Sequence, residues 1–527
     1  MPVRGEILAD AVAALRGGDT ARALALADGL LARDGSDPDA LTVRGMALQA
    51  RGAVQDAIAA MRAAHAADPA NPARAVNLGL ALKAGGLHDE AVVMLQQAVA
   101  ARPQHAPGLA NLGSCLIAAD QAEEAVGVLE RAVALSGQDA GAQNNLGVAL
   151  ARCGRDGEAL GRYDAALALK PAFHEARLNR ADALHRLGRA GEALREAQAV
   201  LDAVPGHPRA ANVAGMACEA LGEHEGAIAI WRDALDRQPS HPVGVNLMRL
   251  LLKLGREDEV PPIADRLLAA APGSTTPLAY LAAALDRAGE GAALDALCEI
   301  ERFVRIIDIT PPAGFATVDA FGAALEGELR AHPSLTFEPE GLVTRKGRQS
   351  GELADADTPA IAALADIART ALAEHAEAIG EGPAHPFADA RPEGWSLTLW
   401  GTLLTPGGAV EPHIHAPNWL SGVYYPAAIT ADDSDEGAFA IGPLPEELGG
   451  GGTARVIRPR AGRMILFPSF LWHGTLPFSG GANASALRST WCPMGWAART
   501  ACRPGRQGPE RAGRADSPGE RRKAIGQ

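Results

Sequence analysis

Small apolar residues recur at a fixed spacing of 34 along the first 300 residues of the chain. Glycine holds one recurrent position, alanine a second and proline, replaced once by Gly137, a third: Gly45, Gly79, Gly113, Gly147 and Gly215; Ala23, Ala57, Ala91, Ala125, Ala159, Ala193 and Ala227; Pro69, Pro103, Pro171, Pro205 and Pro239. The abundance of alanine favours closely packed helices over strands. Two short antiparallel helices per period account for all three series, because small residues let the helices cross closely and proline ends the second helix.

This pattern resembles the tetratricopeptide repeat (TPR), a helix-turn-helix unit of the same length. One unit cannot bury its apolar face alone, so several units must stack into a superhelix. About seven units run from residue 4 to residue 241, a degenerate unit follows near residues 254–260, and a remnant extends to about residue 308. The sequence therefore predicts an all-α TPR superhelical solenoid over residues 1–308.

A fourth series at the same spacing carries carboxamides. Its members are Asn77, Asn111, Asn145 and Asn179, and Asn212 and Asn246 continue it one residue out of register. We expect them on the first helix of each unit, which lines the concave surface of such a solenoid. A row of carboxamides can both donate and accept hydrogen bonds along an extended peptide backbone. Asparagine is also common at this position of the repeat itself, so a peptide groove and a purely structural row both stay open.

Beyond about residue 308 the period ends, and proline, glycine, tryptophan and alternating apolar residues appear. Residues 357–379 predict one helix, with Thr358 as its N-cap and Pro359 in its first turn. Short alternating runs predict strands at residues 396–404, 420–425, 438–441, 454–457, 463–467 and 488–491. This spacing predicts an antiparallel double sheet, or jelly roll. The expected domains are the solenoid, a jelly-roll domain with flanking helices over residues 309–498, and a disordered arginine-rich tail over residues 499–527.

Three histidines fall near the ends of these strands. His413 and His415 close the first strand region, and His473 follows His413 by 60 residues. Alternate residues of a strand face the same side, so His413 and His415 can point into one interior, where His473 on an opposing strand could join them. Three protein ligands around a metal leave positions open for a co-substrate and oxygen, as in non-haem Fe(II) oxygenases.

The segment from about Trp400 to Trp491 resembles a family of bacterial 2-oxoglutarate/Fe(II) oxygenases that are distantly similar to prolyl hydroxylases. The resemblance rests on a set of short motifs: His-x-His at 413–415, Leu-Ser-Gly-Val-Tyr-Tyr at 420–425, Gly462 before a strand ending in Phe-Pro-Ser at 467–469, the distal His473, and Arg488 on a closing strand. It implies a double-stranded β-helix (jelly-roll) fold that binds Fe(II) and 2-oxoglutarate, consumes O2 and uses ascorbate as an accessory reductant.

The resemblance also assigns roles to single residues. His413 and His473 would bind the iron, and Arg488 would pair with the distal carboxylate of 2-oxoglutarate, to which a guanidinium makes bidentate bonds. Further contacts to this carboxylate would come from other polar side chains on the strands: Thr490, and one of Tyr424 and Tyr425.

The chain departs from the wider superfamily at His415, because most such enzymes have Asp or Glu at this position. Either three imidazoles bind the metal, or His415 lies behind the ligands and another group completes the site. Glu411 is expected at the rim of the site. The arginines between residues 455 and 463 are expected to form a solvated hairpin.

Composition restricts the location and the partners. A formal net charge of -14 argues against general nucleic-acid binding, and no apolar run approaches the length of a membrane span. The six cysteines include no CxxC pair, and the N-terminus has no signal-like pattern. These features predict a cytoplasmic protein that binds neither nucleic acid nor membrane.

Three functions fit this sequence. The leading hypothesis is a 2-oxoglutarate-dependent hydroxylase whose substrate is a peptide or protein recruited by the TPR groove. The alternative is an interaction scaffold with a catalytically inactive β-domain; the missing carboxylate favours it, whereas Arg488 and the histidine motifs disfavour it. A cupin-like metal hydrolase or isomerase would leave Arg488 unexplained.

Overall fold

The computed structural model describes residues 3–338, 343–428, 434–477 and 484–493, the last segment by its backbone only. The predicted tail, residues 499–527, lies outside the described residues. The chain divides into two compact units, Met1–Val243 and Gly244–Gln527. The predicted domain boundary at residue 308 stays a prediction.

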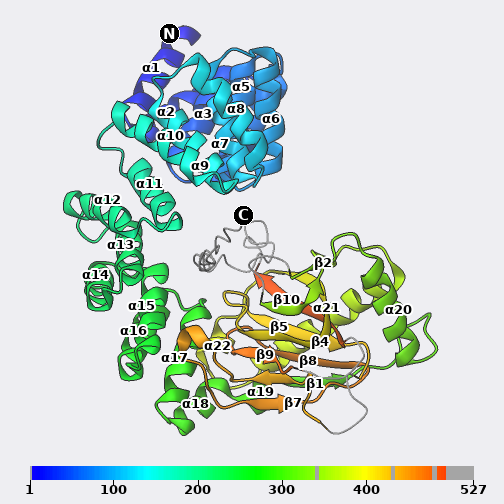
Figure 1. Cartoon of the computed structure of the whole chain (residues 1–527). Coiled ribbons are helices and arrows are strands. Elements are labelled where there is room, and N and C mark those ends of the chain that lie inside the picture. The colour runs from blue at the N-terminus through cyan, green and yellow to red at the C-terminus, as the bar shows by residue number, and fades with distance from the viewer. Residues whose placement is uncertain (1–2, 339–342, 429–433, 478–483, 494–527) are drawn as a thin grey trace, which may run out of the picture. The chain divides into compact units, whose positions relative to one another are not determined.

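The first unit consists of consecutive antiparallel helix pairs (Figure 1). Its helices are α1 (Arg4–Arg16), α2 (Thr20–Leu31), α3 (Pro38–Ala50), α4 (Val54–Ala67), α5 (Pro72–Ala84), α6 (His88–Ala101), α7 (Ala106–Ala118), α8 (Ala122–Leu135), α9 (Ala140–Arg152), α10 (Asp156–Leu169), α11 (His174–Arg186), α12 (Ala190–Ala203), α13 (Pro208–Ala220) and α14 (His224–Arg237). Helix α15 (His241–Lys253) crosses the boundary between the units. These consecutive helix pairs confirm the predicted TPR solenoid.

The three small-residue series have the roles expected of them. A Cβ added at Gly79 would lie 2.7 Å from Cγ of Leu95 and 3.2 Å from the carbonyl oxygen of Ala91, so only glycine allows α5 and α6 to approach this closely. Every alanine of the second series is fully buried. Each proline of the third series lies two residues beyond the end of a second helix, as Pro103 does after α6.

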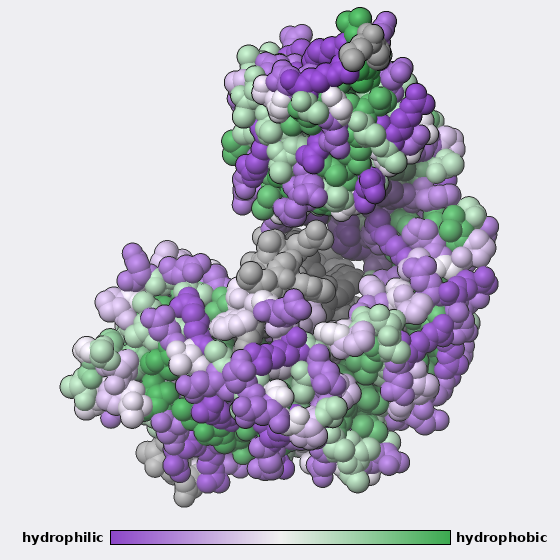
Figure 2. All heavy atoms as spheres, turned by 180° about the vertical axis from the view of Figure 1, so that it is seen from behind, coloured by the Kyte–Doolittle hydropathy of each residue, from purple (hydrophilic) through white to green (hydrophobic). Residues whose placement is uncertain are grey.

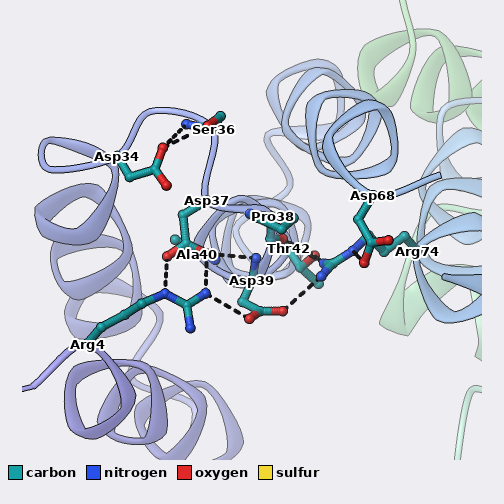
Figure 3. A network of polar contacts seen from close by, with 10 residues as sticks. All are labelled: Arg4, Asp34, Ser36, Asp37, Pro38, Asp39, Ala40, Thr42, Asp68 and Arg74. Atoms are coloured by element: carbon teal, nitrogen blue, oxygen red, sulfur yellow. Dashed lines mark hydrogen bonds and ion pairs between the residues drawn. The ribbon is translucent and has the colours of Figure 1, made fainter. Parts of the chain in front are cut away.

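A chain of ion pairs joins the first repeats (Figure 3). Arg4 binds both carboxylate oxygens of Asp37 at 2.7 and 2.6 Å and reaches Asp39 at 2.9 Å. Asp39 also accepts from Arg74, which binds Asp68 at 2.9 Å and is only 7% exposed. Asp37 additionally caps helix α3 through its oxygen. Because each buried charge has partners, this network links α1, α3 and α5 without leaving an unpaired charge among these groups.

The second unit begins with the degenerate repeats and continues into a β-domain. Its helices after α15 are η1 (Glu257–Glu259), α16 (Pro261–Ala270), α17 (Thr276–Arg287), α18 (Gly291–Cys298), α19 (Ile300–Phe303), α20 (Val318–Ala331), α21 (Pro359–Gly380), α22 (Pro386–Asp389) and η2 (Glu446–Leu448). Its strands are β1 (Arg305–Asp308), β2 (Thr336–Phe337), β3 (Thr344–Gln349), β4 (Trp395–His413), β5 (Leu420–Tyr425), β6 (Phe439–Ile441), β7 (Arg455–Ile457), β8 (Arg463–Pro468), β9 (His473–Thr475) and β10 (Ala484–Pro493).

The strands form antiparallel layers that share one long strand. The order β1-β8-β5-β10-β4-β9-β6-β7 describes the pairing, with β3 added beside β4 and β2 beside β3. Residues 395–404 of β4 pair with β10, whereas Val410 and His413 at its other end pair with β9. One strand therefore contributes to two sheet regions, β8-β5-β10-β4 and β4-β9-β6-β7. This is the predicted antiparallel double-sheet fold, and its described strands do not close into a barrel.

Helices α20 and α21 lie beside the sheet region β8-β5-β10-β4 (Figure 1). Gly401 of β4 lies against the side chain of Leu329, so α20 covers the face of β4 that bears Gly401. Thr358 occupies the N-cap position of α21, as predicted, but its hydroxyl makes no capping bond. Glu328 of α20 caps the helix instead and accepts hydrogen bonds from the amides of Ala360 and Ile361 at 2.9 and 2.8 Å. A carboxylate at a helix N-terminus is stabilised by the helix dipole.

Hydrophilic residues cover much of the surface, and hydrophobic residues lie among them in small groups (Figure 2). Among the described residues, no helix has both the length and the apolar content required to cross a membrane. The buried apolar side chains lie between paired helices in the first unit and between sheets and helices in the second.

Candidate metal centre

Three histidines of the second unit converge at the junction of the two sheet regions. His413 ends β4 and pairs directly with His473, the first residue of β9. His415 lies two residues beyond the end of β4, so its place does not follow from strand alternation, contrary to our expectation. The possible ligand atoms of the three side chains all lie within 4.8 Å of one another. The expected opposing-strand arrangement of His413 and His473 is present.

Backbone carbonyl groups determine the tautomers of two of these histidines. Nδ1 of His413 lies 2.8 Å from the carbonyl oxygen of Glu411, and Nδ1 of His473 lies 2.9 Å from that of Leu471. A carbonyl can only accept, so each Nδ1 must carry the proton and each neutral ring has its lone pair on Nε2. Nε2 of His413 is 2.9 Å from Nε2 of His415. A cation or a shared proton between these atoms relieves the repulsion between the lone pairs.

A pair of buried hydroxyl groups orients His415. Nδ1 of His415 lies 2.9 Å from Oγ of Ser421, which lies 2.7 Å from Oγ of Ser469. Both serines are fully buried, and the backbone N–H of His415 donates to the carbonyl of Ser469. If His415 donates to Ser421 and Ser421 to Ser469, Nε2 of His415 carries its lone pair toward the other two rings. Hydrogen bonds of this kind behind ligating histidines fix ring orientation at metal sites.

The cluster is apolar on one side and accessible on the other. His473 is fully buried, and its ring centroid lies 4.6 Å from that of Phe467 and 5.5 Å from that of Phe439. His413 and His415 are half-buried, and His415 packs edge-on against Trp400. A ligand can therefore reach the cluster from the side of His413 and His415, while the phenylalanines exclude water behind His473.

No carboxylate belongs to the cluster among the described residues. The nearby Glu411 is half exposed and forms a bidentate ion pair with Arg345, at 2.9 Å for both contacts. This is the rim position expected for Glu411. The donor set thus comprises three imidazoles, which suit Fe, Zn, Cu and Ni among the transition metals.

The two neighbouring tyrosines face opposite sides of β5. Tyr425 lies on the same face as Ser421 by strand alternation, and Ser421 points into the metal centre. Tyr424 lies on the other face, where its ring is 6.1 Å from that of Phe321 on α20. Burial raises the pKa of the Tyr424 phenol well above its usual range. Of the two tyrosines, only Tyr425 lies on the interior face.

Arg488 and Thr490 lie on β10, for which the structure describes the backbone alone. Arg488 occupies the register position between Trp400 of β4 and Val423 of β5. Thr490 occupies the position between Thr398 and Ser421. The roles predicted for their side chains stay predictions.

Thr402 is a candidate that the sequence did not reveal. It shares the face of β4 with Trp400, is 1% exposed, and its Oγ1 has no hydrogen-bond partner among the described residues. Burying a hydroxyl without a partner costs roughly 1–3 kcal/mol, so such a group calls for a ligand. Its signal in the sequence was only an alternating strand position, which many threonines share.

In the first unit, the asparagine row lies on α5, α7, α9 and α11, the first helices of their pairs, as expected. All four side chains are half-buried. Asn179 is already engaged, because it donates to Asn144 at 2.8 Å and accepts from Arg209 at 2.6 Å. Asn77 borders a hollow of about 120 Å³ between α5, α6 and α7. This volume accommodates a single side chain and not a whole small-molecule ligand.

The fold and the site together define a class of protein: helical repeats followed by an antiparallel double-sheet domain with a three-histidine cluster. Residues 398–486 match the family described as "Putative 2OG-Fe(II) oxygenase". Residues 82–146 match one tetratricopeptide-repeat family, and residues 8–72, 145–208 and 178–242 match another. The chain therefore contains TPR repeats and a C-terminal segment that matches the model of this oxygenase family.

Similar solved structures are TPR proteins. A tetratricopeptide repeat protein from Parabacteroides merdae is 16% identical, with a TM-score of 0.40, and the match covers 47% of this chain and 98% of that one. YrrB, described as a TPR protein with an unusual peptide-binding site, is 22% identical over 35% of this chain and 95% of its own, with a TM-score of 0.30. TTC0263 from Thermus thermophilus is 23% identical over 35% and 98%, with a TM-score of 0.30. No curated protein matches the chain.

Proposed function

We propose that this protein is a 2-oxoglutarate/Fe(II)-dependent hydroxylase and that its repeats recruit a peptide or protein substrate. The observation that carries the proposal is the histidine cluster: its possible ligand atoms all lie within 4.8 Å of one another, and backbone carbonyls leave the lone pairs of His413 and His473 on Nε2. The family match to the surrounding strands supports iron as the metal and 2-oxoglutarate as the co-substrate.

The residues present fit both groups. His413, His415 and His473 would hold Fe(II) as neutral ligands, which leaves coordination positions for a chelating co-substrate. Thr402, whose buried hydroxyl has no partner in the described part of the chain, and Tyr425 lie on interior strand faces. The distal carboxylate of 2-oxoglutarate would pair with Arg488, with Thr490 as a further contact.

When bound, Fe(II) and 2-oxoglutarate supply the chemistry in which O2 converts 2-oxoglutarate to succinate and CO2 while one oxygen atom hydroxylates a C–H bond. The protein's own contribution is binding and orientation. Ser421 and Ser469 hold the ring of His415, and the carbonyls of Glu411 and Leu471 hold those of the other two histidines. Phe439 and Phe467 keep water from the buried side of the site.

Succinate release tests this function. The full chain, incubated with Fe(II), 2-oxoglutarate and ascorbate, should release succinate slowly even without a protein substrate. His473→Ala should abolish this release and weaken iron binding because it removes a ligand. Omission of ascorbate tests the predicted reductant requirement. The matched control is His65→Ala on α4, outside the β-domain, which should behave as wild type.

Equal background succinate from wild type and His473→Ala, with no iron bound by either, would contradict the oxygenase function. That result would favour the alternative, an interaction scaffold with an inactive β-domain, to which the missing carboxylate points. The same measurement therefore separates the two functions.

The substrate proposal rests on the asparagine row. Asn111 and Asn145 are half-buried, and their carboxamides can bind a peptide backbone. Replacing both with Ala should weaken binding of the full chain to an array of extended peptides without lowering background succinate release. Gln96→Ala on the second helix α6 is the matched control. Unchanged peptide binding by the double variant would rule out this groove.

A further inference from the structure

Helix α17 belongs to the degenerate repeats, yet its contacts extend along the β-domain of the same unit. Tyr280 follows Asn246 by 34 residues, so α17 continues the period of the repeats. At the C-terminal end of α17, Asp286 accepts a hydrogen bond from the amide of Thr453 at 2.9 Å, and Arg287 donates to the carbonyl of Leu448. This repeat helix is therefore attached to the segment before β7.

The N-terminal end of α17 contacts the segment that carries His415. Thr275 stands at the N-cap position, where a threonine hydroxyl usually accepts from the first turn of the helix. Here the hydroxyl makes no capping bond and donates instead to the carbonyl of Asn418 at 3.1 Å, with Thr275 only 1% exposed. The amide of Asn418 in turn donates to the carbonyl of His415 at 2.9 Å. The Thr275 hydroxyl therefore binds the segment that carries His415 instead of capping α17.

The middle of α17 contacts the residue next to His473. The indole Nε1 of Trp472 donates to the carbonyl of Ala279 at 2.9 Å. The ring of Trp472 packs edge-on against Tyr280, with centroids 6.0 Å apart, and Trp472 is 8% exposed. The backbone of Trp472 is also held, because its carbonyl accepts from Gly442 at 2.8 Å. The residue that precedes the buried histidine is thereby tied to a repeat helix.

We infer that α17 is the positioning element of the metal centre, with Thr275 and Trp472 as its positioning residues. This inference rests on the proposed function. One rigid helix binds the backbone of Asn418, three residues after His415, and the indole of Trp472, the neighbour of His473. Two of the three histidines are therefore fixed relative to each other before a metal binds, which lowers the conformational cost of binding. Neither positioning residue touches the metal.

Cobalt(II) binding to the full chain tests the inference, because the absorption of bound Co(II) reports the geometry of its ligands. Trp472→Phe removes the indole donor and keeps an aromatic ring, and Thr275→Val removes the hydroxyl and keeps the shape. We expect each variant to raise the Co(II) dissociation constant about tenfold and to change the Co(II) spectrum, the size seen when groups behind metal ligands are altered.

Trp231→Phe is the matched control, because Trp231 is a fully buried tryptophan of the first unit whose Nε1 has no hydrogen-bond partner among the described residues. It should leave Co(II) affinity and spectrum unchanged. Equal weakening by the control would show a general loss of stability and overturn the inference. If Trp472→Phe does not fold, Thr275→Val decides by the same measurements.

Two further outcomes separate this inference from the proposed function. If folded Trp472→Phe and Thr275→Val bind Co(II) as wild type does, the positioning role is refuted and the metal centre stands. If the wild-type chain binds no Co(II), both the metal centre and the positioning role fail.

Discussion

At the scale of single residues, hydrogen-bond acceptors decide what the three histidines can bind. Two carbonyl oxygens force Nδ1 of His413 and His473 to carry protons. Ser421 provides a hydroxyl for His415, which no motif in the sequence identified as its partner. The presence of a histidine cluster was predictable from the His-x-His motif and the distal His473. The tautomers were not, because they depend on partners set by backbone geometry.

Thr402 should matter for the co-substrate and not for stability. Its buried hydroxyl has no partner among the described residues, so Thr402→Val removes no hydrogen bond from the part of the fold that they form. We expect thermal stability that is no lower than that of wild type and a KM for 2-oxoglutarate about fivefold higher, the size of one lost hydrogen bond of ~1 kcal/mol. Succinate release at varied 2-oxoglutarate measures this, with Thr370→Val on the exposed face of α21 as control. An unchanged KM would exclude Thr402 from the site.

Two buried histidines should make the second unit sensitive to acid. Burial lowers the pKa of both His375 and His385. Nε2 of His375 lies 2.9 Å from the carbonyl of Phe303, and Nδ1 of His385 accepts from the amide of Phe387 at 3.0 Å. A folded-state pKa below the unfolded value means that the unfolded chain binds more protons as the pH falls below about 6.5, so stability falls with pH.

Thermal melting between pH 7.5 and pH 5 tests whether stability falls as the pH falls. The melting temperature of wild type should fall toward pH 5, and His375→Gln should show a shallower fall because one titrating group is gone. Comparison of the two proteins under identical conditions cancels the contribution of the metal-site histidines. Parallel curves for the two proteins would contradict a role for His375.

At the scale of elements, local sequence patterns predicted the strands well but did not predict contacts between residues that are distant in sequence. The strands β5, β6, β7, β8 and β10 begin or end within a few residues of the predicted runs. Residues 405–413 of β4 and the short strand β9 lie outside the predicted strand runs, although His473 was expected on a strand opposite His413, and the two segments pair with each other. The cap of α21 was assigned to Thr358, a sequence neighbour, whereas Glu328 of another helix performs it.

Two glycines should respond in opposite ways to the same substitution. Gly79 lies where α5 and α6 cross, and a Cβ there would lie 2.7 Å from Leu95, so Gly79→Ala should destabilise the first unit by roughly 1–3 kcal/mol. Gly127 of α8 is exposed and has nothing within 4 Å of an added Cβ, so Gly127→Ala should stabilise by about 0.5–1 kcal/mol. Denaturant unfolding measures both. A loss of stability at Gly127 or a gain at Gly79 would contradict the helix-crossing argument.

At the scale of the whole molecule, the last repeat helices and the β-domain form one compact unit. Phe303 is fully buried, with its ring 5.0 Å from that of Phe387, and β1 pairs with β8 along Arg305–Asp308. Trp472 rests on α17. The β-domain therefore depends on residues before 309 for part of its core.

This dependence predicts the behaviour of two fragments. Residues 309–498 lack Phe303, β1 and α17, and large buried aromatic groups contribute roughly 3–5 kcal/mol each, comparable with the whole stability of a domain. We expect this fragment to unfold or aggregate and a fragment of residues 241–498 to melt cooperatively. Circular dichroism melting compares them. A stable 309–498 fragment would show that the α17 contacts are dispensable for the fold.

The sequence by itself determined the repeat architecture, the double-sheet class of the C-terminal domain and the histidines of the candidate metal centre. These properties are local, because helix crossing, strand alternation and short motifs are read within a few dozen residues. Only the tertiary structure decided that Tyr425 and not Tyr424 lies on the interior face and that Glu328 caps α21. The same holds for the link from α17 to Trp472, since each of these contacts joins residues that are distant in sequence.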